Sequence, residues 1–219
     1  MAILQRKARP SVRPNHKHLM SLIRAITLAM AIALGQNAFA EGLYTGIGVV
    51  ATGAASQVDQ DGSGAESRAL YGGLGGTVGY AWGRESGLLA AEVDADLNFN
   101  TDFESDGQLC SESVSAPYYC SHANTVRLRG IFGKSFGDRT IFGSAGLMIM
   151  VGEIAKAPED LTLALSAGFT LGAGFTHPFR GNRLRYEIIY DRATTALTTP
   201  DGTNPAFAGV AFKTSYLFD

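Results

Sequence analysis

The stretch LTLALSAGFTLGAGF, at residues 161–175, limits the possible folds of this chain more than any other. Leu, Phe and Ala occupy its odd positions, whereas small or polar residues occupy its even positions. Side chains of a strand point alternately to opposite faces, so the pattern predicts one long β-strand with two unlike faces. Strands of soluble proteins average about five or six residues, but a tilted strand that crosses a bilayer needs roughly nine to eleven. This strand is long enough to cross a membrane.

Seven further segments alternate in the same way. They are residues 43–56, 68–82, 88–99, 124–136, 139–151, 184–191 and 207–218. The connections alternate too: long polar loops at 57–67, 100–123, 152–160 and 194–205 take turns with short turns at 83–87, 137–138 and 178–182. Short turns on one side and long loops on the other are typical of bacterial outer-membrane barrels. The sequence therefore predicts an all-β fold, an eight-stranded antiparallel up-and-down transmembrane β-barrel with both termini in the periplasm.

A soluble barrel of the lipocalin type is the alternative, because it would place the same apolar face inside. Glycine on the polar face, the uniform strand length and aromatic residues near strand ends favour the membrane barrel. We expect these aromatic residues to face lipid: Tyr80, Trp82, Phe99, Phe169, Phe175, Tyr190, Phe212, Tyr216 and Phe218. Phe136 and Phe207 are expected in the same girdles.

Residues 1–40 have the pattern of a secretory signal peptide. Arg24 precedes an apolar core at 25–34, and Ala38 and Ala40 form a small-x-small cleavage site. Met20 is an alternative start, because the segment from it onward is a complete signal peptide. The ten apolar residues are too few for a membrane helix. We expect residues 41–219 to form the mature barrel domain, in the bacterial outer membrane.

The charge of the mature chain argues against a nucleic-acid partner. The first 40 residues carry six of the 18 Lys and Arg residues and no Asp or Glu, which leaves 12 basic and 20 acidic groups and a net charge of −8. Proteins that bind nucleic acids usually present a basic patch. We expect the partners to be outer-membrane lipids, including lipopolysaccharide, and the barrel-insertion machinery; no external ligand is indicated.

Two cysteines, Cys110 and Cys120, lie in one predicted loop of an exported chain. That context favours a disulfide over two free thiols. The bond would order the loop rather than hold the domain together.

Charged residues on the polar face are expected to meet inside the barrel. Three carboxylates on one predicted strand lie beside two arginines on the next, and an Arg-x-Glu pair forms a second group. The members are Glu92, Asp94, Asp96, Arg127, Arg129, Arg185 and Glu187. Because eight strands enclose only enough space for side chains, we expect a salt-bridged plug. A narrow ion path along these charges is the alternative.

Two longer motifs resemble a known family. TVRLRGIFGKSFGDRTIFGSAGLMI (125–149) and LGAGFTHPFRGNRLRYEIIYDR (171–192) are similar to strand-and-turn signatures of small outer-membrane barrels of the opacity and outer-membrane-protein-A type, in particular the major surface barrels of alphaproteobacteria. The resemblance implies the fold and no chemistry. Members of that family usually end on an aromatic residue that the insertion machinery reads, whereas here Asp219 follows Phe218.

No motif predicts an enzyme, a metal site or a cofactor. His122 and His177 are the only histidines after residue 40; His122 is expected in a loop and His177 at a periplasmic turn. The run of acidic residues at 59–66 begins like a calcium loop, but the remaining ligands of that pattern are absent. The sequence therefore predicts a structural barrel that displays its loops on the cell surface. The alternatives are a low-conductance, porin-like passive channel and a surface adhesin or recognition protein.

Overall fold

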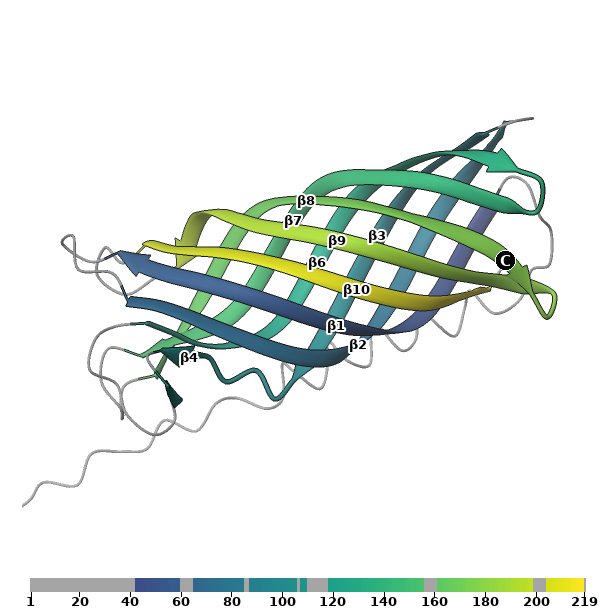
Figure 1. Ribbon diagram of the computed structural model, residues 1–219. Coiled ribbons are helices and arrows are strands. Elements are labelled where there is room, and N and C mark those ends of the chain that lie inside the picture. Colours follow the sequence, from purple (N-terminus) through teal and green to yellow (C-terminus); the bar gives the residue numbers. More distant parts are fainter. Residues whose placement is uncertain are drawn as a thin grey trace, which may run out of the picture. The chain divides into compact units, whose positions relative to one another are not determined.

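The computed structural model describes residues 42–59, 65–84, 87–105, 107–109, 118–155, 161–198 and 204–218. Ten strands occur in this part of the chain, and eight of them are long (Figure 1). The long strands are β1 (Gly42–Asp59), β2 (Ala65–Arg84), β3 (Gly87–Phe99), β6 (Tyr118–Phe136), β7 (Arg139–Ala155), β8 (Leu161–Phe179), β9 (Asn182–Thr198) and β10 (Asn204–Phe218). Among the described residues, no helix is long and apolar enough to cross a membrane.

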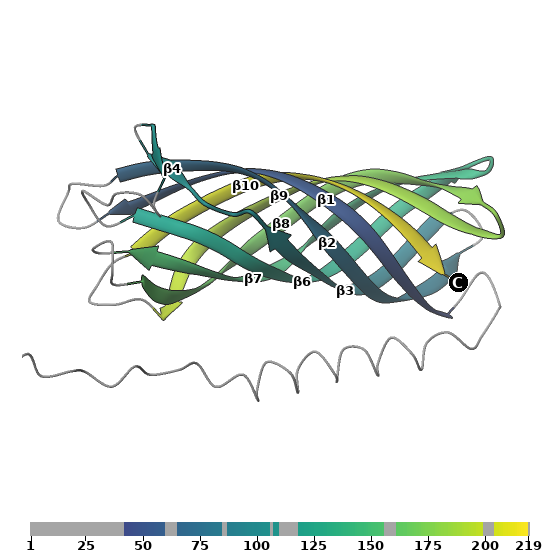
Figure 2. The ribbon, with the colours of Figure 1, turned by 90° about the horizontal axis from the view of Figure 1, so that it is seen from below.

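The eight long strands close into a barrel. Each pairs in antiparallel fashion with its neighbours in the order β1, β10, β9, β8, β7, β6, β3, β2, and β2 pairs back with β1. The closing seam between β1 and β10 runs from Thr45 opposite Phe218 to Asp59 opposite Asn204. Seen from below, the strands cross the barrel axis obliquely (Figure 2), as closure of a sheet requires. The predicted all-β fold, an eight-stranded antiparallel barrel, is confirmed.

The two ends of the barrel differ in their connections. Two-residue turns link β6 to β7 and β8 to β9 at the end where β1 begins and β10 stops, which we call the turn end. Gly137 has a φ of 62° there, and Arg180 and Gly181 have φ values of 52° and 80°. Positive φ at the first or at both central residues suits the tight hairpin turns that match strand twist. The longer connections lie at the opposite end, the loop end.

Most strands continue further toward the loop end than apolar alternation predicts. β9 runs to Thr198, although residues from 194 onward were expected in a loop, and β6 begins at Tyr118 rather than at 124. At the turn end, β8 passes through Pro178 to Phe179, so the turn is shorter than the expected 178–182. Backbone pairing needs no apolar side chains, so hairpins extend beyond the apolar part of each strand.

Two short strands lie on the chain between β3 and β6. β4 (Glu104–Ser105) and β5 (Gln108–Leu109) pair with each other, and Glu104 of β4 lies opposite Arg68 of β2. Because β3 ends at Phe99 while β2 begins at Ala65, the first part of β2 extends past β3. The β4–β5 hairpin sits beside that extension, inside a segment expected to be one long loop.

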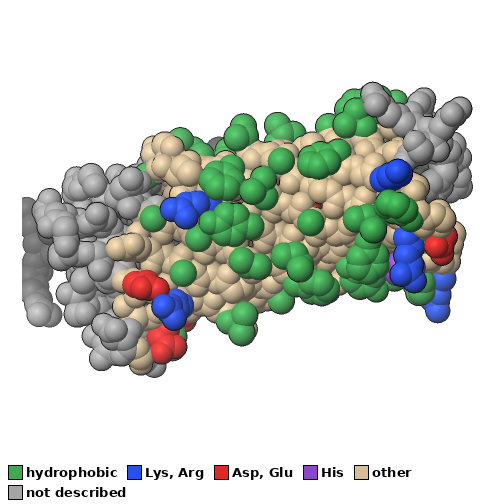
Figure 3. Space-filling view, turned by 45° about the horizontal axis from the view of Figure 1, so that its top comes forward, with side chains coloured by type: hydrophobic (Ala, Val, Ile, Leu, Met, Phe, Trp, Pro, Cys, Tyr) green, Lys and Arg blue, Asp and Glu red, His purple; other side chains and the backbone are tan. Residues whose placement is uncertain are grey.

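The outside of the barrel wall is apolar, and the charged side chains of the strands' inner faces are buried in the lumen. Large apolar side chains are exposed on all eight long strands, including Leu70 at 82% and Leu147 at 67%. On the face shown in Figure 3, hydrophobic side chains are spread over the wall, and charged side chains lie toward its two ends. On β7, Phe142, Met148 and Met150 point inward and Ile141 and Leu147 point outward.

Candidate functional site

A cluster of ionised side chains fills the middle of the barrel. Glu92, Asp94 and Asp96 alternate along β3, so all three reach the same face, and each is at most 2% exposed. The register of β6 places Arg129 directly opposite Glu92 and Arg127 opposite Asp94. Sequence alternation thus brings cations and anions side by side in the lumen.

Arg127 holds three carboxylates together. Its Nη1 donates to Asp94 Oδ1 at 2.8 Å and to Asp96 Oδ2 at 2.5 Å, and its Nη2 donates to Asp191 Oδ2 at 2.6 Å. Asp191 comes from β9, so this guanidinium connects β3 and β6 with β9. Charge-assisted bonds of this kind are stronger than neutral ones.

Arg129 and Arg185 share a second set of carboxylates. Arg129 Nη2 lies 2.6 Å from Glu92 Oε1, and its Nη1 lies 2.8 Å from Glu187 Oε1. Arg185 Nη1 lies 2.6 Å from Glu92 Oε2. The expected second group, Arg185 with Glu187, joins the first, because each of the two residues pairs with a member of it.

Two members of the network, Lys213 and Asp191, were not among the residues expected from the sequence. Lys213 Nζ, from β10, donates to Asp94 and, at 2.7 Å, to Asp96 Oδ1. Asp191 accepts a hydrogen bond from Arg127. Both residues lie on the polar face of strands that the sequence predicts correctly. A charged residue on that face was the available signal.

Neutral hydroxyl groups complete the network. Tyr44 donates to Glu92 at 2.8 Å, Thr77 to Asp94 at 2.9 Å and Ser144 to Glu187 at 2.9 Å. The five carboxylates and four cations are called here the charged layer: Glu92, Asp94, Asp96, Glu187, Asp191, Arg127, Arg129, Arg185 and Lys213. Every member has at least one ionic partner, which the low polarity of a closed interior requires.

Glycine makes room for the charged layer. A Cβ on Gly75 would lie 2.5 Å from Lys213 Nζ, and one on Gly172 would lie 2.6 Å from Glu187 Oε1. A Cβ on Gly79 would lie 2.5 Å from the Tyr44 hydroxyl oxygen. These separations are shorter than van der Waals contact. The glycines of the polar face thus have a steric reason to lack side chains.

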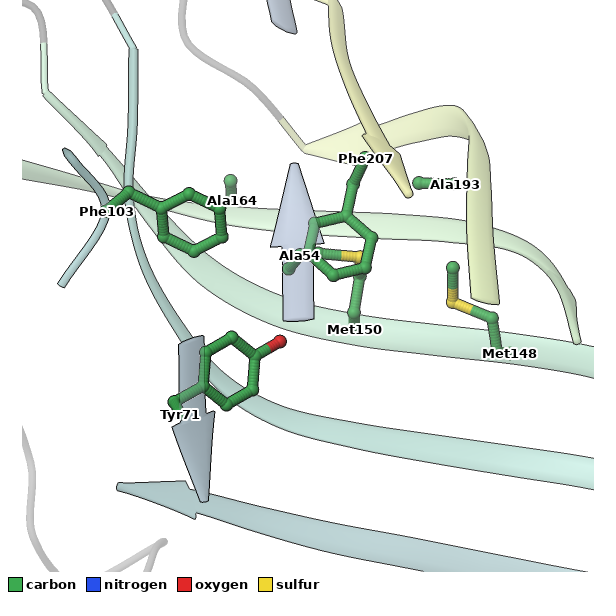
Figure 4. Packing of buried hydrophobic residues seen from close by; sticks show 8 residues of the cluster. All are labelled: Ala54, Tyr71, Phe103, Met148, Met150, Ala164, Ala193 and Phe207. Atoms are coloured by element: carbon green, nitrogen blue, oxygen red, sulfur yellow. The ribbon is translucent and has the colours of Figure 1, made fainter. Parts of the chain in front are cut away.

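Apolar clusters lie on both sides of the charged layer. The outer apolar cap, at the loop end, contains Ala54, Tyr71, Phe103, Met148, Met150, Ala164, Ala193 and Phe207 (Figure 4). The inner apolar cap, at the turn end, contains Tyr44, Ala81, Ala90, Ile131, Phe142 and Leu217. Phe103 belongs to the chain after β3 and is fully buried in the outer cap. Phe207, expected in a lipid-facing girdle, is 3% exposed and lies in the same cap, since it has the inward parity of Gly209 and Ala211.

His122 lies inside the barrel rather than in a loop. A register shift in β6 between His122 and Asn124 turns the imidazole inward, where it is 3% exposed. Its Nδ1 contacts the Tyr71 hydroxyl, and its Nε2 lies 2.8 Å from Thr125 Oγ1. Both ring nitrogens are therefore engaged with hydroxyl groups, and the ring also contacts Phe207 of the outer apolar cap.

His177 stacks in an outward-facing row of rings at the turn end. Its ring is 5.9 Å from Tyr186 and 6.4 Å from Phe175, centroid to centroid. The two described histidines thus lie at opposite ends of the barrel. Within the described residues, no group of three or more His, Cys, Asp or Glu side chains is arranged to hold a metal ion.

Apart from Phe207, the aromatic residues expected to face lipid lie on the outer wall. Tyr80, Trp82, Phe99, Phe169, Phe175 and Phe212 are exposed, and Tyr190, Tyr216 and Phe218 are partly exposed. Several of them pair: Tyr80 with Trp82 at 5.3 Å, and Tyr216 with Phe218 at 5.0 Å.

Three expectations concern residues that the structure does not describe. The expected signal peptide lies in residues 1–40, and most of the acidic loop lies in residues 60–64. The expected disulfide involves Cys110, which is not described, and Cys120, whose side chain in β6 is not described. The disulfide and the cleaved leader therefore stay predictions.

Comparison with known proteins extends no further than the fold. No protein-family model and no curated protein matches the sequence. Among solved structures, the chain is similar to Ail, the attachment invasion locus protein of Yersinia pestis, with 12% identity, a TM-score of 0.45, and 82% of this chain and all of that chain covered. It is similar to the outer membrane protein OprG of Pseudomonas aeruginosa, with 14% identity, a TM-score of 0.44, and 82% and 97% covered.

A third similar structure is an enzyme, the outer membrane protease OmpT of Escherichia coli. The identity is 7%, the TM-score is 0.43, and 83% of this chain and 99% of that chain are covered. Likenesses this remote carry no argument about activity. The resemblance of residues 125–149 and 171–192 to the opacity and outer-membrane-protein-A type stays a prediction.

Proposed function

We propose that this chain is an integral outer-membrane β-barrel whose role is structural, with a filled lumen and surface-exposed loops. The observation that carries the proposal is the distribution of side chains between the two faces of the wall. Exposed Leu, Ile, Val and Phe occur on all eight long strands, while nine ionised side chains are buried in the lumen. A soluble barrel has the reverse arrangement.

The energetics of the two faces favour a bilayer as the solvent. Each large apolar side chain left in water forgoes roughly 1.5–3 kcal/mol of transfer free energy. Monomeric soluble proteins rarely expose contiguous apolar patches of more than a few hundred Å². A belt around the whole barrel exceeds that by far, and lipid tails would cover it. Closed barrels also satisfy every backbone group between strands, which the hydrocarbon region demands.

The filled lumen favours a structural role over transport. The charged layer lies between two apolar caps, so a hydrated ion would have to pass both caps and displace the paired side chains between them. We therefore favour display of the loops over the alternative of a passive channel. Recognition of a host or phage partner by those loops is compatible with the same barrel.

The orientation follows from the two ends. Short turns face the periplasm and long loops the exterior in bacterial barrels, so we infer a periplasmic turn end, with both barrel termini there. On this view the lipid partners are lipopolysaccharide outside and phospholipid inside, and β10 is the strand that the insertion machinery reads. No catalytic step is proposed, because His122 is engaged by Tyr71 and Thr125 inside the lumen and His177 lies on the outer wall.

Heat-modifiable migration in detergent gels tests the membrane barrel. The unboiled chain should migrate differently from the boiled chain, because a closed membrane barrel resists unfolding by detergent. An epitope inserted at 60–64 should be labelled on intact cells, whereas one inserted at 137–138 should be labelled only after the outer membrane is opened. Identical migration with and without boiling would overturn the proposal, and surface labelling at 137–138 would overturn the orientation.

A further inference from the structure

The net charge of the exposed, described residues differs in sign between the two ends of the barrel. At the turn end, the exposed and described ionised residues are Lys134, Asp138, Arg139 and Arg180, so cations exceed anions by three to one. At the loop end, Glu66, Arg68, Asp102, Glu104 and Arg192 are exposed, and anions exceed cations. The excess of cations at the turn end is not explained by the charged layer, which lies inside the barrel.

The cations of the turn end point outward, toward lipid. Lys134 and Phe136 share the outer face of β6 with Phe132, which is 58% exposed. Arg139 lies opposite Phe136 on β7, and Arg180 occupies the turn that follows Phe179 of β8. The three cations therefore lie on adjoining elements of the turn end, namely β6, β7 and the β8–β9 turn, and are called here the band.

Aromatic rings accompany these cations. Lys134 Nζ lies 5.7 Å from the Phe136 ring, and the Arg180 guanidinium carbon lies 5.3 Å from the Phe179 ring. Aromatic residues of membrane proteins sit at the level of the lipid headgroups. Long basic side chains at that level direct their charged ends toward the interface. The charges are therefore held at the height where phosphate groups of lipid occur.

Neighbouring rings supply a flat apolar wall beside the band. Phe175, His177 and Tyr186 stack, with interplanar angles from 4° to 29°. Next to them, Asn182 donates to the Tyr216 hydroxyl at 2.8 Å, and Tyr216 contacts the Phe179 ring. The surface thus combines a place for acyl chains with polar and cationic groups for a headgroup.

The three cations have no carboxylate partner among the described residues, in contrast to Arg68 at the loop end. Arg68 lies 2.8 Å from Glu66, whereas Lys134, Arg139 and Arg180 form no ion pair within the part of the chain that the structure describes. Unpaired cations beside a bilayer attract anionic lipid.

We propose that the band formed by Lys134, Arg139 and Arg180, with the rings of Phe136 and Phe179, binds the phosphodiester headgroup of an anionic phospholipid of the periplasmic leaflet. This inference rests on the proposed membrane insertion and orientation. Lipids of the phosphatidylglycerol class fit, because they present a negative phosphodiester without an amine. The band would fix the depth of the turn end in the membrane.

Quenching of tryptophan fluorescence tests the proposal in the full barrel domain. Trp82 is the only tryptophan of the chain, is 45% exposed and lies on β2 at the turn end. It is in register with Leu89 of β3, which in turn lies opposite Phe132 of β6. Two vesicle preparations would contain the same mixture of phosphatidylcholine and phosphatidylglycerol. In one, the acyl chains of phosphatidylcholine are brominated; in the other, those of phosphatidylglycerol are brominated. The comparison gives the relative affinity of the wall for the two lipids.

We expect a preference for phosphatidylglycerol of about threefold or more. The preference should disappear in the triple variant Lys134→Gln, Arg139→Gln, Arg180→Gln. It should persist in the matched variant Arg68→Gln, Arg192→Gln, which changes cations of the loop end. Equal quenching by both lipids, or an unchanged preference in the triple variant, would overturn the inference. Quenching by brominated phosphatidylcholine and the heat shift in gels report insertion separately. A chain that inserts without lipid preference thus fails only this inference, and one that does not insert fails the proposed function.

Discussion

At the scale of single residues, Arg129 shows how the lumen is held together. Its guanidinium lies between Glu92 and Glu187, which come from β3 and β9, and neither carboxylate is more than 1% exposed. A buried ion pair contributes little relative to apolar packing, but removing one partner leaves an uncompensated buried charge. The cost of removing water from the ions offsets much of the attraction within these ion pairs. Loss of Arg129 is nevertheless costly, because it would leave its carboxylate partners buried without it.

Replacing Arg129 by Met should lower the free energy of unfolding by about 3–5 kcal/mol. The measurement is equilibrium unfolding in urea with the barrel in detergent or vesicles. Arg68→Met is the matched control, because Arg68 is exposed, and its effect should stay within about 0.5 kcal/mol. Similar values for the two variants would contradict the account of the charged layer.

A second prediction concerns the space beside Gly79 in the lumen. Gly79→Ala would place a methyl group against the Tyr44 ring and displace the hydroxyl that donates to Glu92. We expect a loss of about 1–3 kcal/mol, typical of an overfilled interior. Gly53→Ala is the control, since a Cβ there meets nothing within 4 Å. Unfolding experiments that rank Gly53→Ala as the more harmful change would be inconsistent with the lumen packing.

At the scale of elements, alternation in the sequence was enough to predict eight strands, their order and, for most strands, which face looks into the lumen. Charge pairing across β3 and β6 also followed from the chain order, since hairpin neighbours pair. Contacts across the lumen did not follow, because Arg127 to Asp191 joins strands that are not neighbours. The inward turn of His122 depends on a register shift that no residue pattern announced.

The segment after β3 was expected to be a loop, but it contains two short strands and a buried side chain. A third prediction concerns that side chain, Phe103. Phe103 anchors residues 100–105 in the outer apolar cap. Phe103→Ala removes about 3 kcal/mol of packing, so amide hydrogen exchange at 100–109 should become roughly a hundredfold faster while the strands keep their protection. Phe99→Ala is the control, because Phe99 faces outward. Unchanged exchange in the Phe103 variant would mean that this side chain does not hold the segment.

At the scale of the whole molecule, the lumen consists of three zones in series along the barrel axis: the outer apolar cap, the charged layer and the inner apolar cap. The caps consist of packed apolar side chains, and every ionised group of the charged layer is paired, so each zone opposes ion passage. The wall around them is closed by the β1–β10 seam, so no gap at a sheet edge offers another route. Loss of one zone therefore leaves two barriers intact.

Conductance across planar bilayers tests this arrangement. We expect no steady openings from the native chain and none from Phe103→Ala, because the charged layer and the inner cap, including Ile131 and Phe142, remain in place. The same preparations should show the heat shift in gels, which proves that folded barrels were added, and a general porin should conduct in the same membranes. Steady openings of the native chain that vanish when Arg127 and Arg129 are replaced would establish an ion path along the charged layer. That result would replace the filled barrel by a narrow channel.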